Sequence, residues 1–140
     1  MFPLLLALIA TTLPTSMKAI RAHDRGGPEV LRYEDAPVPT PGAGEMLVQV
    51  YAAGVNPVDW KVVRGGGRGR NAQSSPLIPG YDVAGVVRAA GDGAAFQAGD
   101  QVFAFLDLGR AGAYAEYAIV RTNEAARKPK SADFVHAAEW

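Results

Sequence analysis

The side chains best suited to chemistry are gathered in one short segment, Asn56-Pro-Val-Asp-Trp-Lys61. Asn is a favoured N-cap and Pro is favoured at the first helical position, so a helix is expected to begin here. Asn56, Asp59 and Lys61 would then place an amide, a carboxylate and an ammonium group within two turns, beside the free N–H groups of a helix start. Local chemistry alone favours a structural interpretation, in which Asn56 caps the helix, Asp59 supports its first turn and Lys61 is solvated.

The other candidate groups do not indicate a second site. His23 and His136 lie far apart in the sequence, and a shared metal site is not expected. The run Gly65-Gly-Gly-Arg-Gly-Arg70 lacks the repetition and interleaved aromatic residues of RNA-binding segments, which favours a solvated loop. No window matches the Walker pattern, and Gly91-Asp-Gly93 is followed by Phe96 where a Rossmann fingerprint needs its third glycine. The sequence therefore contains no recognisable phosphate-binding loop.

Composition narrows the class of protein further. The 140 residues contain no cysteine, which excludes disulfides, a thiolate nucleophile and cysteine-ligated metal sites. Fourteen basic residues balance fourteen acidic ones, so net charge gives no attraction to nucleic acid or to an anionic membrane. Sixteen glycines and ten prolines beside 49% hydrophobic residues indicate a turn-rich globular chain rather than a disordered one.

Alternating apolar and polar positions predict a mainly β protein around this segment. Strands are expected at residues 17–22, 30–34, 45–53, 82–89, 101–105 and 112–120. Residues 36–42 contain three prolines and are expected as a connector or an edge, since proline cannot donate to a sheet. Residues 65–75 are expected as a loop, and a helix is expected from Asn56 to about Val63. Ser131 is expected to cap a last helix, which the end of the chain at Trp140 interrupts.

Residues 1–16 differ from the rest of the chain, because they are apolar and uncharged. One interpretation is a secretory signal peptide. Against it, the first basic residue is Lys18, and a small-residue cleavage pattern is poor because Leu8 lies three residues before a cut after Ala10. The stretch is also too short to span a bilayer. The favoured alternative is a non-native extension, with the folded part beginning near Met17.

Four motifs, in this order and at plausible spacing, resemble the N-terminal catalytic domain of medium-chain dehydrogenases/reductases. They are Ala52-Ala-Gly-Val-Asn-Pro-Val-Asp-Trp-Lys61, Pro79-Gly-Tyr-Asp-Val-Ala-Gly-Val-Val87, Phe96-Gln-Ala-Gly-Asp-Gln-Val102 and Gly112-Ala-Tyr-Ala-Glu-Tyr117. Within that superfamily the chain resembles the zinc-free quinone oxidoreductase and enone reductase branch. The resemblance implies a GroES-like, partly open β-barrel with short helices at residues 17–130. Residues 131–140 would begin a truncated C-terminal helix that links to a missing dinucleotide-binding domain.

The same resemblance implies that no zinc binds. Zinc-dependent relatives have a cysteine ligand where this chain has Asn56, and a His-Glu pair where it has Tyr81-Asp82. Amide and phenol groups are poor zinc ligands beside thiolate and imidazole. The four-cysteine lobe that holds a structural zinc in such relatives is also missing from this sequence.

The implied activity is hydride transfer from NADPH to a quinone or an α,β-unsaturated carbonyl. Asn56 and Lys61 would line the reacting side of the cleft, and Lys61 could donate a hydrogen bond or a proton to a developing enolate. Asp59 is expected to anchor the loop rather than to react. The cleft residues implied beside the two catalytic candidates are Asp59, Trp60, Tyr81 and Asp82.

Without its dinucleotide-binding (Rossmann) domain, the chain is expected to be inactive and to bind NADPH only weakly, because a half-cleft cannot orient the reactants. The alternative is a non-catalytic GroES-like module, either a pseudo-enzyme or a partner-binding domain. Neither nucleic acid nor a stable membrane association is expected. A cytoplasmic location is expected, with a secreted or membrane-associated form through residues 1–16 as the alternative.

Overall fold

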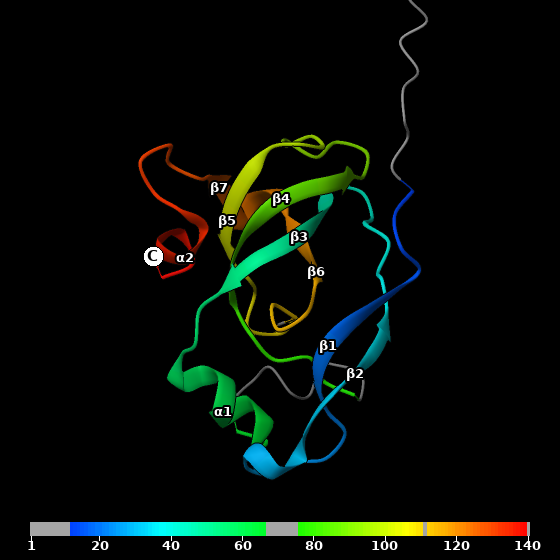
Figure 1. Cartoon of the computed structure of the whole chain (residues 1–140), viewed down its shortest axis with the longest axis vertical. Coiled ribbons are helices and arrows are strands. Elements are labelled where there is room, and N and C mark those ends of the chain that lie inside the picture. Colours follow the sequence, from blue (N-terminus) through cyan, green and yellow to red (C-terminus); the bar gives the residue numbers. More distant parts are fainter. Residues whose placement is uncertain (1–11, 67–75, 111, 140) are drawn as a thin grey trace, which may run out of the picture.

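A computed structural model describes residues 12–66, 76–110 and 112–139 of the chain (Figure 1). The predicted leader at residues 1–11 and most of the predicted loop at 65–75 lie outside these ranges. The protein is mainly β, as predicted, with strands in two sheets that do not close into a complete barrel. Within the described part of the chain, no helix is long and apolar enough to cross a membrane.

The larger sheet has five antiparallel strands in the order β6-β3-β4-β5-β7. The strand bounds are β3 Glu45–Ala53, β4 Asp82–Ala90, β5 Gln101–Phe105, β6 Tyr117–Arg121 and β7 Ala125–Arg127. β3 and β4 form the longest pairing, and its register shifts twice, between Leu47 and Val48 and between Val50 and Ala52. Such bulges bend a strand, which suits a curved sheet.

The smaller sheet pairs β1, Ser16–Ala22, with β2, Leu31–Pro37, and a 3-10 turn at Pro28–Val30 precedes β2. Two isolated bridges, from Ala19 to Ala115 and from Ala22 to Leu77, connect β1 to the rest of the molecule. Figure 1 shows this sheet beside β6, with its far end reaching the level of α1.

One apolar core lies under the larger sheet. Its most deeply buried members lie in or directly beside strands that are far apart in sequence and include Met46, Val48, Tyr81, Val83, Val87, Val102, Leu106 and Val120. A separate small cluster joins Ala84 of β4 to Ala137 and Ala138. Ala137 is the last residue of helix α2, Phe134–Ala137, and Ala138 is its C-cap. Helix α2 therefore packs directly on the sheet.

Several predicted boundaries were wrong. Helix α2 starts at Phe134 rather than after Ser131, because the Asp133 carboxylate accepts the His136 N–H at 2.8 Å and caps the helix there. Of the predicted strand at 112–120, only residues 117–120 lie in a strand, β6, which continues to Arg121. The short β7 was not predicted. β2 extends to Pro37, at the end of the two-stranded sheet, where the missing N–H of proline costs no hydrogen bond between strands.

Candidate functional site

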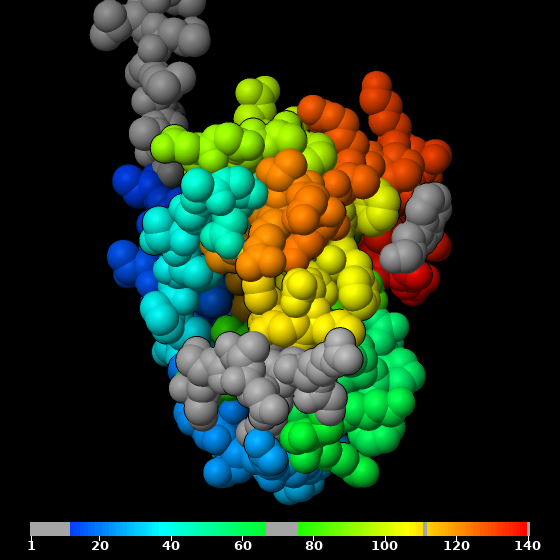
Figure 2. Space-filling view, turned by 180° about the vertical axis from the view of Figure 1, so that it is seen from behind, coloured from blue at the N-terminus to red at the C-terminus, as the bar shows by residue number. Residues whose placement is uncertain are grey.

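Helix α1, Pro57–Val63, forms where the sequence predicts it. Asn56 is its extended N-cap and Pro57 occupies the first turn, where a missing N–H costs nothing. Val62 and Val63 are buried and attach the helix to the core. Seen from behind in Figure 2, the green α1 meets the blue segment that follows β1 at the lower end of the molecule.

Asp59 is the centre of the site. Its carboxylate is only 5% exposed and accepts three hydrogen bonds from three separate segments. Oδ2 accepts the backbone N–H of Asn56 at 2.7 Å and the hydroxyl of Tyr114 at 2.8 Å, while Oδ1 accepts the N–H of Gly80 at 3.1 Å. A buried carboxylate is tolerated when it is hydrogen-bonded in this way. Asp59 therefore holds the start of α1 against the segments that contain Gly80 and Tyr114.

Asn56 connects this centre to β4. Its side-chain amide donates a hydrogen bond to Oδ2 of Asp82, the first residue of that strand. Asn56 thus does more than cap a helix: its backbone binds Asp59 and its side chain binds Asp82. Burial raises the pKa of Asp82, the Asn56 amide opposes that rise, and the charge of Asp59 adds to it.

Replacing Asp82 with asparagine is expected to change how stability depends on pH. Because the pKa of Asp82 is higher in the folded than in the unfolded protein, the folded state binds more protons as pH falls toward 3.8. This carboxyl therefore lowers stability as pH rises through the interval between 3.8 and its raised folded pKa. Urea unfolding at several pH values should show this loss in the parent protein and a flatter profile in Asp82→Asn. Equal slopes in the two proteins would contradict the assignment.

Tyr114 was not among the residues predicted for the site, although it belongs to a motif that was singled out. Its hydroxyl also lies 3.3 Å from the carbonyl of Gly54. Burial and the neighbouring Asp59 carboxylate raise the pKa of Tyr114 well above its usual value, so it stays a neutral donor. Its position depends on a backbone connection between distant segments, which sequence spacing does not reveal.

A cavity of about 410 Å³ adjoins this network. Three groups of residues line it: the turn before β2 together with Leu31, positions along α1 and on either side of it, and the pair Pro79 and Tyr114. The lining includes Gly26, Pro28, Leu31, Val55, Asn56, Asp59, Trp60, Val63, Pro79 and Tyr114. The walls are mainly apolar, and the lining residues with polar or charged side chains include Asn56, Asp59, Tyr114 and Arg64. A mainly apolar cavity with a few fixed polar groups is typical of a small-molecule site.

The predicted residues fall into three groups: those that line the cavity, those that adjoin it, and Tyr81. Asn56, Asp59 and Trp60 line the cavity. Lys61 and Asp82 adjoin these residues: Lys61 directly follows Trp60 in the chain, and Asp82 accepts a hydrogen bond from the Asn56 side chain. Lys61 is exposed, and its ammonium group lies 5.6 Å from the centre of the Trp60 ring. Trp60 is 51% exposed, so its ring forms an open rim. Lys61 is not among the residues that line the cavity, and its catalytic role stays a prediction.

Tyr81 lies elsewhere. Its side chain is fully buried in the core, its hydroxyl lies 3.3 Å from the carbonyl of Leu108, and its ring stacks on Phe105. It does not line the cavity, and its place in a substrate cleft stays a prediction.

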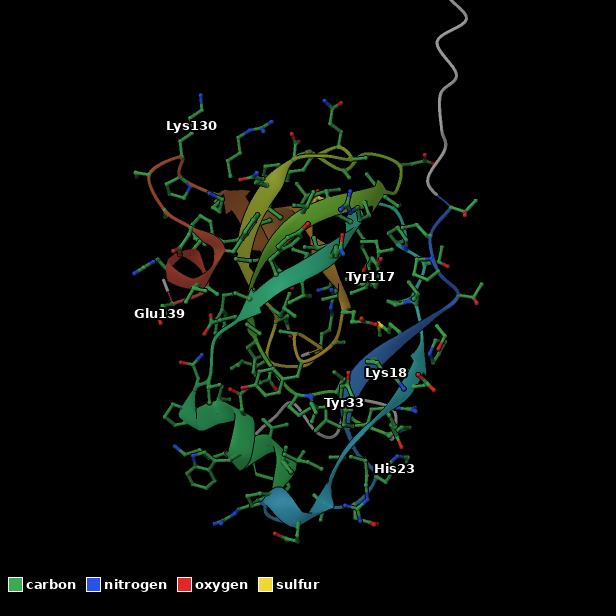
Figure 3. The ribbon with its side chains drawn as sticks, in the orientation of Figure 1. Lys18, His23, Tyr33, Tyr117, Lys130 and Glu139 are labelled. Atoms are coloured by element: carbon green, nitrogen blue, oxygen red, sulfur yellow. The ribbon has the colours of Figure 1, made fainter. Side chains whose placement is uncertain are left out.

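No metal cluster is evident in the ranges that the structure describes, where no three His, Cys, Asp or Glu side chains gather closely enough. His23 contacts Glu34 at 2.5 Å, and His136 contacts Asp133 at 2.7 Å. Figure 3 shows His23 at the far end of the β1–β2 pair, on the opposite side of the molecule from α2. That the protein binds no zinc stays a prediction.

Comparison with protein families gives one match that covers more than half of the chain. The profile described as "Alcohol dehydrogenase GroES-like domain" matches residues 42–130. Among curated proteins, the quinone oxidoreductase of Rattus norvegicus is 42% identical over 120 residues, which cover 84% of this chain. The chain spans about a third of the length of that relative (35%).

Solved structures agree with this match. The quinone oxidoreductase from Coxiella burnetii has a TM-score of 0.84 at 31% identity, covering 89% of this chain and 41% of that one. A mycobacterial protein solved in complex with NADPH has a TM-score of 0.75 at 34% identity, covering 89% of this chain and 36% of that one. This chain is therefore similar to these proteins in both fold and sequence.

Proposed function

The chain belongs to the alcohol dehydrogenase GroES-like family, and from this membership we propose that it is the substrate-side domain of an NADPH-dependent oxidoreductase that reduces quinones or α,β-unsaturated carbonyls. The observation that carries the proposal is the Asp59 network, which fixes Asn56 and the start of α1 at the wall of a mainly apolar cavity. The identity with quinone oxidoreductases supports the choice of substrate class.

The described residues fit the reactive end of such a cofactor but not its phosphates. A mainly apolar cavity of about 410 Å³ suits a flat ring, and the sequence has no recognisable loop to hold a pyrophosphate. In the proposed enzyme a separate dinucleotide-binding domain supplies that loop. When bound, the cofactor supplies a hydride, which is the chemistry that no amino-acid side chain provides.

This chain's own residues would orient and polarise the acceptor. Trp60 and the apolar walls would pack against a planar substrate and exclude water from it. Lys61, one residue further along α1, would donate a hydrogen bond or a proton to the substrate oxygen as negative charge develops there. Asn56 would line the same side, with its amide held by Asp82. We propose that no zinc takes part, since Asn56 and Tyr81 are weak ligands.

Loss of the Lys61 ammonium group is expected to lower turnover by about 100-fold, the usual scale for a positioned proton donor. The test uses a joined protein in which this chain replaces the matching segment of the rat relative. NADPH oxidation with a quinone is followed for the unmodified, Lys61→Ala and Lys130→Ala proteins. Lys130 is an exposed lysine far from α1 (Figure 3), so its variant should keep full activity.

Two results would contradict parts of this proposal. If Lys61→Ala kept its kcat and KM, Lys61 would have no role in the reaction. If dialysis against a strong zinc chelator abolished turnover of the joined protein and added zinc restored it, the proposal that no zinc takes part would be wrong.

A further inference from the structure

Tyr114 meets the proposed active-site helix from a distant part of the chain. It is half-buried, it lines the cavity, and its hydroxyl donates to Oδ2 of Asp59 at 2.8 Å. The same oxygen of Asp59 accepts the backbone N–H of Asn56 at 2.7 Å. One carboxylate oxygen thus joins Tyr114 to the first residue of the α1 segment.

The backbone holds Tyr114 firmly in this place. Its N–H donates to the carbonyl of Pro79 at 3.0 Å, and its own carbonyl accepts the N–H of Ile20 on β1 at 2.8 Å. Its ring lies against Gly80, where a Cβ would come within 2.6 Å of Cδ1. Gly80 also has a φ of +96°, a conformation that side chains other than glycine adopt only with strain. Tyr114 is therefore a fixed point from which its hydroxyl can hold a neighbour.

Asp59 transmits this position to the residues that would face the substrate. It lies three residues after Asn56 and immediately before Trp60 and Lys61, within the same two turns of α1. The helix has only seven residues and is exposed at Trp60 and Lys61. Val58, Val62 and Val63 pack it against the core, and the hydrogen bonds of Asp59 and Asn56 add to what fixes its first turn. Short helices are marginal without tertiary contacts.

We propose that Tyr114 is a positioning residue for the reaction: its hydroxyl, through Asp59, fixes the first turn of α1 and so sets where Asn56 and Lys61 stand at the cavity. This inference rests on the proposed function. Tyr114 would not touch the reacting atoms with its hydroxyl, which is already used by Asp59. Removing the hydroxyl would loosen the geometry while leaving the ring as a cavity wall.

The first test examines the contact itself in the full chain. Tyr114→Phe removes one oxygen atom, and Tyr117→Phe is the matched control, since Tyr117 is also half-buried but lies on β6 outside the Asp59 network. In amide NMR spectra, Tyr114→Phe should shift the signals of Asn56, Trp60 and Lys61, and Tyr117→Phe should leave them in place. Unchanged α1 signals in Tyr114→Phe would overturn the inference.

The second test measures the kinetics of quinone reduction by the joined protein. Tyr114→Phe should lower kcat by about tenfold with KM within about twofold, since a small displacement of a catalytic group is costly in rate. Because Tyr114 acts through Asp59, adding Tyr114→Phe to Asp59→Asn should lower kcat no further. Independent, multiplicative losses would contradict the inference.

The two possible failures can be told apart. Absence of turnover in a folded, unmodified joined protein would refute the proposed function, and the positioning role with it. Turnover that Tyr114→Phe leaves unchanged would overturn this inference alone.

Discussion

Replacing Asp59 with alanine is expected to lower the free energy of unfolding by about 4 kcal/mol, a large share of the ~5–15 kcal/mol that holds a domain together. The carboxylate is 5% exposed and accepts the N–H groups of Asn56 and Gly80 as well as the Tyr114 hydroxyl. Alanine leaves these donors without that partner, and a buried donor that loses its acceptor costs about 1–3 kcal/mol. The Tyr114 hydroxyl retains the Gly54 carbonyl nearby, which limits the loss.

Urea unfolding of the full chain measures this effect. Asp92→Ala is the matched control, because Asp92 is exposed in the turn between β4 and β5, and its replacement should change stability by less than about 0.5 kcal/mol. A loss of less than about 1 kcal/mol in Asp59→Ala would show that the carboxylate does not hold the three segments together.

Replacing Gly85 with alanine is expected to cost about 3 kcal/mol. Gly85 lies in β4 opposite Val50, next to a register shift in the central β3–β4 pair. A Cβ at Gly85 would lie 2.0 Å from the backbone oxygen of Gln49, so the two strands would have to separate. Overpacking of a tight interior typically costs about 1–3 kcal/mol, and here the obstacle is backbone rather than a flexible side chain.

The same unfolding measurement tests this prediction. In Gly42→Ala the new Cβ meets the end of the Glu45 side chain at 3.3 Å, and that side chain can move aside. Gly42→Ala should therefore cost less than about 1 kcal/mol. If Gly85→Ala were as stable as Gly42→Ala, the close approach of β3 and β4 would not be a property of the folded protein.

The parts of the fold that could be predicted from sequence carry local signals. Alternating side chains predicted β3, and the pair Asn56-Pro57 predicted the start of α1. The capping of α2 was predicted two residues too early, because Ser131 and Asp133 are both good caps and only the structure shows which one binds a free N–H.

The centre of the site could be predicted only in part. Asp59 was expected to anchor a loop, and it does so by accepting hydrogen bonds from Gly80 and Tyr114 as well as from its own helix. Those partners lie 21 and 55 residues away in the sequence. Contacts over such distances depend on how the strands pair, which local patterns do not specify. Tyr114 was missed for this reason.

The central claim is that this chain orients and polarises a quinone or enone for reduction by NADPH. The most direct measurement is the rate of quinone-dependent NADPH oxidation by the joined protein, in which this chain replaces the matching segment of the rat relative. We expect turnover well above that of the separated dinucleotide-binding segment, and its loss by about 100-fold in Lys61→Ala. A joined protein that folds and binds NADPH but reduces neither a quinone nor an enone would contradict the claim and favour a non-catalytic module.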